Sequence, residues 1–305
     1  MSEPFTLYQR EVPLGGPRAM TVRRALPQRE RSLIGAWCFV DHYGPDDVSS
    51  TGGMSVPGHP HTGLQTVSWL FSGEVEHRDT SGAHALVRPG ELNIMTAGSG
   101  IAHSEFSTPS TTVLHGAQLW VALPGAHRLT TPGFEHYAPP TAVVDGATVR
   151  VFLGQLFGQT SPVATFTELI GAEVVLPAGA ELRIVVDPAH EHGLLCDTGT
   201  IAVGAANAKP GEIVFQPAGA TSITVRSGDE PLRFLVLGGA PLGEQIVMWW
   251  NFVGGSHDEV VGFREDWQRQ RTAPDNGGRF GTFPVEWAAT LPAPELPNVR
   301  LRSRG

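Results

Sequence analysis

Cysteine is nearly absent from this 305-residue chain, which contains only Cys38 and Cys196. The two residues are far apart in the sequence and form no CxxC pair, so neither a disulfide scaffold nor a zinc knuckle is indicated. Methionine is also rare, with five residues, and only 17% of the residues are charged. This composition argues against a long-helix or coiled-coil protein.

Long apolar runs and blocks of basic residues are missing as well. No stretch of about 18 apolar residues occurs, and the opening sequence MSEPFTLYQR lacks the basic, apolar and small-residue pattern of a secretory signal. The formal net charge is −9, which disfavours binding to nucleic-acid phosphates. We therefore expect a cytoplasmic protein that contacts neither a membrane nor nucleic acid directly.

Glycine and proline are abundant, with 37 and 25 residues, while 41% of the chain is hydrophobic. The apolar residues fall in short runs that Gly or Pro residues bound, and such runs predict the strands of a sandwich or barrel. The clearest are residues 66–71, 117–123, 149–154, 181–186, 212–217 and 232–239.

One helix is predicted, in SHDEVVGFREDW (256–267). Ser256 and Glu259 fit a capping box at its start, and Val260, Phe263 and Trp267 share one face. The sequence therefore predicts an all-β protein with a short C-terminal helix.

The chain also contains an internal repeat. PGELNIMTAG (89–98) resembles PGEIVFQPAG (210–219) at an offset of 121 residues. Two similar β units in tandem explain this similarity, although a chance match of one short segment is the alternative. We place the boundary near residue 160, which gives domains 1–160 and 161–305.

Two pairs of residues that could bind a metal, each containing histidine, occur in the N-terminal half of the sequence. His59 and His61 stand at positions i and i+2, which project to the same face of a strand, and His103 and Glu105 repeat this spacing. If the two strands face each other across a barrel, three nitrogens and one carboxylate converge. This donor set suits a divalent first-row metal such as Fe(II) and leaves one or two positions open.

The spacing of the surrounding glycines is similar to that of the cupin superfamily, whose fold is a small β-barrel with the metal inside. Gly53 precedes His59 in the pattern G-x5-H-x-H, and Gly90 begins a second motif that leads to His103. The sequence departs from the general cupin pattern at Gln65, where a Glu is usual. It also has four residues rather than two between Gly98 and His103.

The second departure is typical of one branch of that superfamily, the pirins. Four segments resemble pirins and together cover most of the N-terminal half: IGAWCFVDHYGP (34–45), HPHTGLQTVSWLFSGEVEHRD (59–79), MTAGSGIAHSEF (95–106) and QLWVALP (118–124). The resemblance implies two tandem cupin, jelly-roll-like β-barrels. The first, 1–160, holds the metal, whereas the second, 161–305, has no metal site and includes the C-terminal helix and tail.

The resemblance also implies a ligand set. A non-haem iron would be held by His59, His61, His103 and Glu105, with Mn, Ni, Cu or Zn as alternative metals. Gln65 replaces a Glu that is usual in pirins. It either points inward to hydrogen-bond a ligand or a metal-bound water, or is a polar residue of the core.

The remaining histidines are interpreted differently. His42 and His77 match family positions and are expected to be structural hydrogen-bonders, whereas surface or loop positions are expected for His84, His115, His127 and His136. His190-Glu191-His192 is a second HxH motif, but only seven residues separate His192 from Gly199, against twelve between His61 and Gly73. We therefore predict that the second unit binds no metal.

Pirins have been linked to quercetin 2,3-dioxygenase activity, in which O2 opens a flavonol ring and carbon monoxide is released. The resemblance thus implies an enzyme that acts on a small aromatic or enolic substrate, with Glu105 as the catalytic base. Candidate walls for a flat substrate are Trp69, Phe71, Phe106 and Trp120, of which at least two are expected in the core.

Two other functions stay open from the sequence. Pirins are also associated with redox-sensitive protein contacts, so the alternative is an iron-dependent regulatory protein that binds a transcription factor or a metabolic enzyme. A third hypothesis is a cupin that only stores or isomerises a small molecule.

Overall fold

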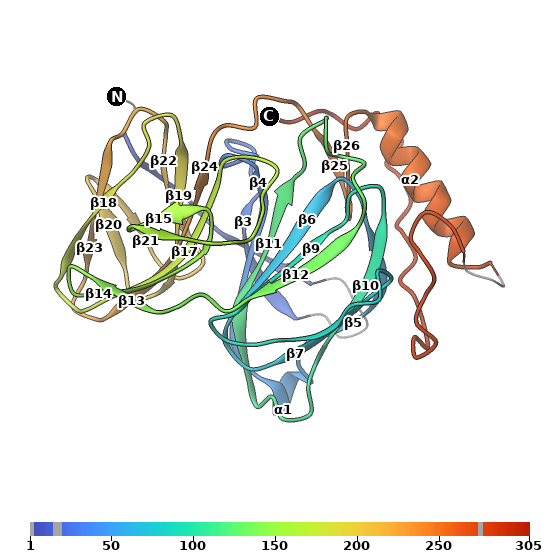
Figure 1. The fold of residues 1–305 in the computed structure, drawn as a ribbon, viewed down its shortest axis with the longest axis horizontal. Coiled ribbons are helices and arrows are strands. Elements are labelled where there is room, and N and C mark those ends of the chain that lie inside the picture. Colours follow the sequence, from blue (N-terminus) through green and yellow to red (C-terminus); the bar gives the residue numbers. More distant parts are fainter. Residues whose placement is uncertain (1–2, 15–19, 274–276) are drawn as a thin grey trace.

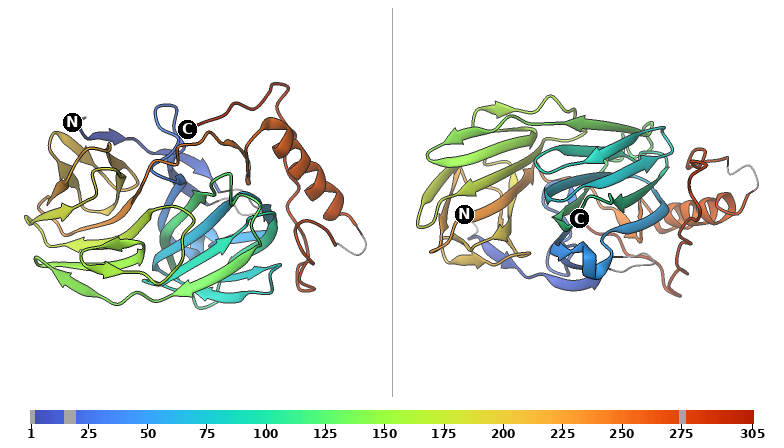
Figure 2. Two further views of the ribbon diagram at one scale, coloured as in Figure 1. Left: turned by 45° about the horizontal axis from the view of Figure 1, so that its top comes forward. Right: turned by 90° about the horizontal axis from the view of Figure 1, so that it is seen from below.

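Two antiparallel β-barrels lie side by side in the computed structural model, which describes residues 3–14, 20–273 and 277–305 (Figures 1 and 2). Each barrel combines a seven-stranded sheet with a four-stranded sheet. The all-β prediction is confirmed, since the described residues form only two helices. Neither of these helices is long and apolar enough to cross a membrane.

The first barrel is built from the N-terminal half of the chain. Its seven-stranded sheet contains, in spatial order, β12 (Gly133–Tyr137), β9 (Leu92–Thr96), β6 (Leu64–Ser72), β11 (Val113–Ala122), β4 (Trp37–Asp47), β3 (Thr21–Leu26) and β2 (Arg10–Pro13). Its four-stranded sheet contains β5 (Ser55–His61), β10 (Ile101–Ser107), β7 (Val75–Asp79) and β8 (His84–Val87). The short helix α1 (Val48–Thr51) follows β4.

The second barrel has the same plan. Its seven-stranded sheet contains β1 (Phe5–Leu7), β22 (Ile213–Gln216), β19 (Glu191–Thr198), β24 (Leu232–Gly239), β17 (Leu169–Leu176), β14 (Ala147–Leu153) and β13 (Ala142–Val144). Its four-stranded sheet contains β18 (Glu181–Val185), β23 (Ser222–Ser227), β20 (Ile201–Val203) and β21 (Ala206–Ala208). A small hairpin, β15 (Gln155–Leu156) and β16 (Gln159–Thr160), lies in the connection between β14 and β17.

The repeat in the sequence corresponds to equivalent strands of the two barrels. β9 and β22 each lie one strand from the edge of a seven-stranded sheet. Each strand follows a glycine with positive φ, Gly90 at +74° and Gly211 at +86°, a backbone conformation that favours glycine. Two similar β units are thus confirmed. The boundary at residue 160 stays a prediction, and the strands β13 and β14 that precede it pair within the sheet of the second barrel.

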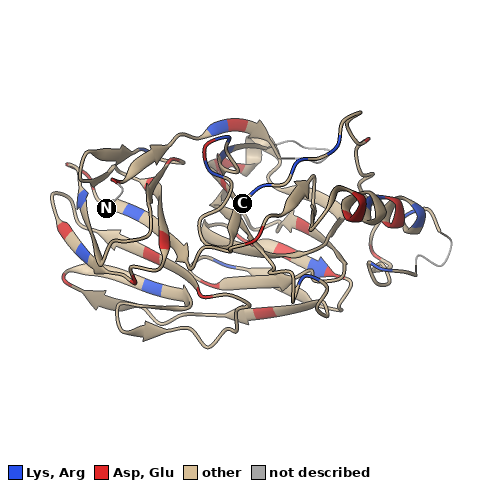
Figure 3. Cartoon of the chain, turned by 90° about the horizontal axis from the view of Figure 1, so that it is seen from above, with Lys and Arg blue, Asp and Glu red and all other residues tan. Residues whose placement is uncertain are grey.

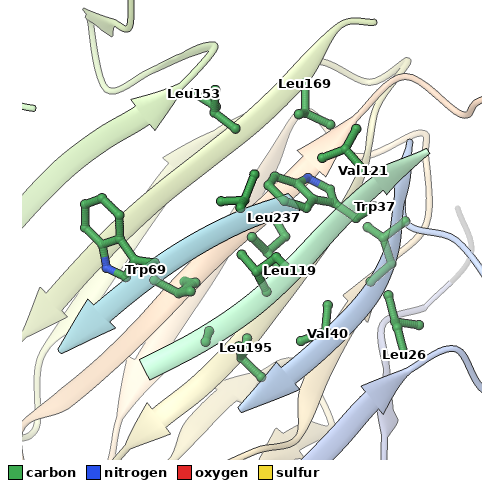
Figure 4. Close-up of a cluster of buried hydrophobic side chains, with 14 of the residues drawn as sticks. Leu26, Trp37, Val40, Trp69, Leu119, Val121, Leu153, Leu169, Leu195 and Leu237 are labelled. Atoms are coloured by element: carbon green, nitrogen blue, oxygen red, sulfur yellow. The ribbon is translucent and has the colours of Figure 1, made fainter. Parts of the chain in front are cut away.

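The two seven-stranded sheets pack face to face around a shared apolar core (Figure 4). Trp37, Trp69 and Leu119 from the first barrel are fully buried in it together with Leu195 and Leu237 from the second. The indole nitrogen of Trp37 donates to two carbonyls of the second barrel at 3.2 Å. Because strand residues alternate between faces, the strand neighbours of Trp37, Trp69 and Leu119 point into the first barrel.

The two ends of the chain are exchanged between the barrels. β1 pairs with β22 of the second barrel. The hairpin of β25 (Val247–Trp249) and β26 (Phe252–Gly254), and helix α2 (His257–Gln270), return to the first barrel, as Figure 1 shows. Val260, Phe263 and Trp267 of α2 are buried in a cluster that includes Ala102 of β10. The helix begins as predicted, with Ser256 accepting from the backbone N–H of Glu259.

A buried polar cluster joins the barrels. The Asp197 carboxylate of the second barrel lies 2.6 Å from His42 Nε2 and 2.7 Å from His115 Nε2 of the first, and Arg233 donates to it at 2.5 Å. Arg23 donates to His42 Nδ1, so His42 Nε2 carries the proton that it shares with Asp197. The hydrogen-bonding interpretation of His42 is confirmed.

The surface or loop prediction for His115 is wrong. This residue is buried in β11, because its partner Asp197 comes from the other barrel. Burial by itself would raise the pKa of Asp197, but the hydrogen bonds from His115 and His42 hold it well below its ordinary value. Asp197 is therefore ionised within this cluster.

We expect Asp197→Asn to lower the free energy of unfolding by about 3 kcal/mol, because the change removes the buried carboxylate that pairs with the half-buried Arg233 and accepts the hydrogen bond of His42. Thermal or denaturant unfolding measures this. Asp229→Asn, at an exposed position, is the matched control and leaves stability within about 0.5 kcal/mol. Equal stability of the two variants would contradict this account of the cluster.

Candidate metal centre

The three predicted histidine ligands come together on two paired strands. β5 and β10 are antiparallel, and His103 lies directly opposite His59. The ring centroids are 4.3 Å apart for His59 and His103, 4.9 Å for His61 and His103, and 5.1 Å for His59 and His61. One nitrogen of each ring lies within 4.8 Å of the others. The three side chains could therefore hold one metal ion.

The hydrogen bonds of these rings leave nitrogens free to bind a metal. His59 Nδ1 lies 2.9 Å from the carbonyl of Pro57 and donates to it, so Nε2 keeps its lone pair. His61 Nδ1 and His103 Nε2 are buried and have no hydrogen-bond partner among the described residues. Buried polar atoms almost always have a partner, and a metal ion would supply it. The donor set fits a divalent first-row metal.

Burial keeps the three imidazoles uncharged. It lowers the pKa of His59 to about 4. The pKa values of His61 and His103 are held well below their ordinary value, by burial first and then by the neighbouring histidines. Neutral imidazole is the form that binds a metal, so the site is in its binding form at neutral pH.

Glu105 lies on the same strand but is offset from the histidine cluster. A register irregularity separates it from His103 in the pairing with β5. Its carboxylate groups with His103 and His77, and among the described residues no single set of mutually close ligand atoms contains all four predicted ligands. Burial raises the pKa of Glu105 above its usual value. Its hydrogen-bond neighbour is Ser68, whose Oγ lies at 3.5 Å.

His77 does more than the sequence indicated. Its Nε2 lies 2.9 Å from Asp79 Oδ2, which confirms it as a structural hydrogen-bonder, and its Nδ1 lies 3.3 Å from Nδ1 of His103. With His77 donating to the Asp79 carboxylate, its Nδ1 accepts from His103, and His103 Nε2 then carries the lone pair. Such partners fix the tautomer of a metal ligand. The only signal for this in the sequence is the i, i+2 spacing of His77 and Asp79.

Gln65 does not point toward the site. Its amide donates to Thr96 Oγ1 at 2.9 Å, a residue directly opposite on β9, and the cavity at the histidines does not include it. This contact favours the interpretation as a polar core residue, but the amide oxygen of Gln65 is buried without a partner among the described residues, so its role stays a prediction. Its side chain points away from the site because the turn at Gly63, with φ of +67°, separates β5 from β6 and breaks the alternation that starts at His59.

A cavity of about 410 Å³ opens onto the three histidines and Glu105. Phe39 and Trp120 form one wall, with ring centroids 4.0 Å apart in a stacked arrangement, and Trp120 also meets His61 edge-on. Of the four aromatic residues proposed as walls, only Trp120 lines this cavity. Trp69 and Phe71 pack in the core between the barrels, as expected for at least two of them.

The turn of the β25–β26 hairpin covers the mouth of this cavity. Trp250 and Asn251 both line it, and Trp250 has a φ of +50°. A non-glycine residue rarely adopts this conformation, and such strain is concentrated at functional sites. These residues could not be predicted as part of the site, because they lie about 145 to 190 positions from the proposed ligands along the chain.

A larger cavity, of about 1200 Å³, lies beside the second barrel and includes His190. None of the groups of close metal-binding atoms found among the described residues includes His190 or His192. The interior of the second barrel is filled by apolar side chains such as Leu182, Ile184 and Val225. The prediction that this unit binds no metal stays a prediction.

Comparison with known proteins agrees with this architecture. Residues 19–121 match the Pirin family, and residues 171–273 match the Pirin C-terminal cupin domain. The chain is 39% identical to a Pseudomonas aeruginosa protein provisionally named a quercetin 2,3-dioxygenase, over 94% of this chain and 89% of the relative. It is 32% identical to a pirin-like protein of Caulobacter vibrioides, over 86% of this chain and 94% of that protein.

The solved structures include a quercetin 2,3-dioxygenase from Acinetobacter baumannii, with a TM-score of 0.90 and 35% identity, which covers 98% of this chain and 97% of that one. Fold and site together define a two-domain cupin protein with a candidate metal centre in its first barrel. The chain belongs to the pirin family.

We expect the metal-free protein to lose stability as the pH falls from about 6.5 toward 4. The buried His59 has a pKa of about 4 against 6.5 for an ordinary histidine, so the unfolded chain binds its proton first. The pKa shift of His59 contributes about 3 kcal/mol to the free energy of unfolding at neutral pH, and this contribution is fully lost once the pH falls below about 4. Unfolding at several pH values measures the slope, which becomes shallower in His59→Asn but not in His84→Asn, at an exposed histidine.

We expect Asp79→Asn to weaken metal binding by about 10- to 100-fold, because His77 would lose the acceptor that fixes the His103 tautomer. Titration of the metal against a chelator of known affinity measures this. Asp258→Asn, on the exposed face of α2, is the matched control. If Asp79→Asn binds the metal as tightly as this control, the hydrogen bonds from His103 to His77 and from His77 to Asp79 do not position His103.

Proposed function

We propose that this protein is an iron(II)-dependent dioxygenase that opens the ring of a flavonol or a related enolic substrate with O2. The observation that carries the proposal is the set of neutral, buried imidazoles with unpartnered nitrogens, at the base of a cavity that a flat ligand can enter. The names of two similar proteins support the same reaction.

We assign the metal to His59, His61, His103 and Glu105. Iron(II) bound there would supply a Lewis acid and an electron donor for O2. The histidines contribute lone pairs without charge, so the site keeps a net positive charge that favours an anionic enolate. Glu105 is assigned as the fourth ligand because one of its carboxylate oxygens lies within 4.8 Å of a ring nitrogen of His103.

Glu105 is also assigned the role of base. Burial raises its pKa, which brings it closer to the range in which a carboxylate takes a proton and holds it. The proton it accepts is that of the substrate hydroxyl. Ser68 Oγ lies 3.5 Å from Glu105 and 3.0 Å from the amide oxygen of Gln118, and its single hydrogen can be donated to only one of these two oxygens at a time.

The stacked pair of Phe39 and Trp120 orients the substrate. Trp120 covers one face of Phe39 and Arg24 covers the other, so the pair offers ring edges to the cavity, and aromatic rings also bind planar ligands in an edge-to-face arrangement. A volume of about 410 Å³ lies within the range of sites for small molecules. The hairpin turn places Trp250 and Asn251 in the lining of the same cavity.

The test is anaerobic loading with Fe(II), followed by quercetin and then O2. We expect loss of the flavonol absorbance together with release of carbon monoxide. Glu105→Gln lowers kcat by at least about 100-fold, the usual contribution of a general base. Glu135→Gln, at an exposed position of β12, is the matched control and keeps the rate.

Unchanged flavonol absorbance in protein with one iron per chain would remove the proposed activity. The regulatory alternative, an iron-dependent protein that binds a transcription factor or metabolic enzyme, stays a prediction from the sequence.

A further inference from the structure

A row of polar side chains crosses the inner face of the first barrel, from its open edge to the candidate metal centre. In adjacent strands, Arg10 lies opposite Arg24, Arg24 opposite Asp41, Asp41 opposite Gln118, and Gln118 opposite Ser68. Residues directly opposite in neighbouring strands share a face of the sheet. The row ends beside the catalytic carboxylate and begins with two arginines.

The two arginines are an unfavourable pair for stability. Like charges directly opposite each other destabilise a sheet, yet the chain places Arg10 against Arg24 at the wall of the cavity. Arg24 is held in place by the fully buried Asp41 through two hydrogen bonds, of 2.7 and 2.8 Å. Its guanidinium lies 4.4 Å from the ring centre of Phe39, and among the described residues its Nη1 has no partner.

A third arginine reaches the same mouth from the other end of the chain. The backbone of Arg304 exchanges two hydrogen bonds of 2.7 Å with Ile246, just before the hairpin that covers the site. Its side chain lines the cavity and has no partner in the described part of the chain. Figure 3 shows the basic residues of this tail beside the C-terminus.

The charge of this cavity is opposite to that of the protein. Three arginines line it, and Glu105 is the only carboxylate among its lining residues, whereas the whole chain has a net charge of −9. Asp41 pairs with Arg24, and Arg10 donates to the carbonyl of Pro27 at 3.2 Å, so among the described residues neither Arg10 nor Arg304 has a carboxylate within ion-pair distance. An electropositive mouth in an acidic protein attracts anions.

We propose that Arg10, Arg24 and Arg304 form an anion subsite, and that the preferred substrate is an aromatic enol that carries an oxyanion group, such as a carboxylate or a sulfonate, at the end remote from its metal-binding oxygens. This inference rests on the proposed function for the identity of the reacting end. The anion subsite itself does not depend on the proposed reaction, because the arginines would bind any anionic ligand of suitable shape in this cavity.

The dimensions of the row agree with such a ligand. β2 and β6 are separated by four strand spacings of about 4.8 Å, or about 19 Å, and the long arginine side chains shorten the distance to be bridged. Phe39 and Trp120 lie between the two ends. The rings of the substrate would pack against the edges of these two side chains, while the oxyanion accepts hydrogen bonds from the guanidinium groups, which suit planar oxyanions.

The test compares quercetin with quercetin sulfonated on its catechol ring. Binding is followed by quenching of tryptophan fluorescence in zinc-loaded protein, which holds the site without turnover, and kcat/KM is then measured in iron-loaded protein. We expect the sulfonated ligand to bind about tenfold more tightly than quercetin, as one charge-assisted hydrogen bond can provide. This preference falls as the ionic strength rises, because the arginines are partly exposed.

The variant that tests the subsite is Arg10→Gln combined with Arg304→Gln, and we expect it to reduce the preference for the sulfonated ligand to less than twofold. Arg24 is left intact, because its loss would leave Asp41 buried without a partner. The matched control is Arg226→Gln, on the exposed face of β23 in the second barrel, which keeps the full preference.

Equal affinity for the two ligands, or a preference that survives in the double variant, would overturn the inference and leave the dioxygenase assignment intact. Conversely, if the sulfonated ligand binds through the arginines but neither compound reacts with O2, the subsite stands and the proposed activity fails. Binding and turnover therefore report on the two proposals separately.

Discussion

The structure depends on keeping three imidazoles uncharged and in contact with one another, away from water. His59 and His103 face each other across a strand pair, and His61 completes the cluster. Two of their nitrogens are buried without a hydrogen-bond partner among the described residues, which is costly in a folded protein. A metal ion that accepts these lone pairs converts the cost into binding free energy.

The rest of the molecule maintains this environment. The C-terminal hairpin and helix α2 pack on the first barrel and close the side next to β5 and β10. The second barrel is filled with apolar side chains, and its seven-stranded sheet packs against the seven-stranded sheet of the first barrel. Asp197 fixes the two barrels to each other through His42 and His115. The large sheet in turn supplies the aromatic wall and the polar row.

The sequence predicted what depends on short-range geometry. The i, i+2 spacings predicted that His59, His61 and His103 come together, as the structure shows, because alternation along a strand is local, whereas Glu105 as a fourth ligand stays a prediction. The repeat at residues 89 and 210 predicted the two units. Gln65 could not be oriented in the same way, since a turn at Gly63 intervenes. His115 could not be interpreted without Asp197. This carboxylate also contacts His42, and it lies 155 residues from His42 along the chain. The row from Arg10 to Ser68 depends on the register of five strands, which no spacing in one segment reveals.

The central claim is that the histidine cluster of the first barrel binds one metal ion through neutral imidazole nitrogens. X-ray absorption spectroscopy of the Fe(II)-loaded protein tests it directly. The account predicts one iron per chain, with about three imidazole nitrogens among its ligands and no sulfur ligand, and loss of this signal in His103→Ala. An iron environment made only of oxygen ligands, or one that His103→Ala leaves unchanged, would contradict it.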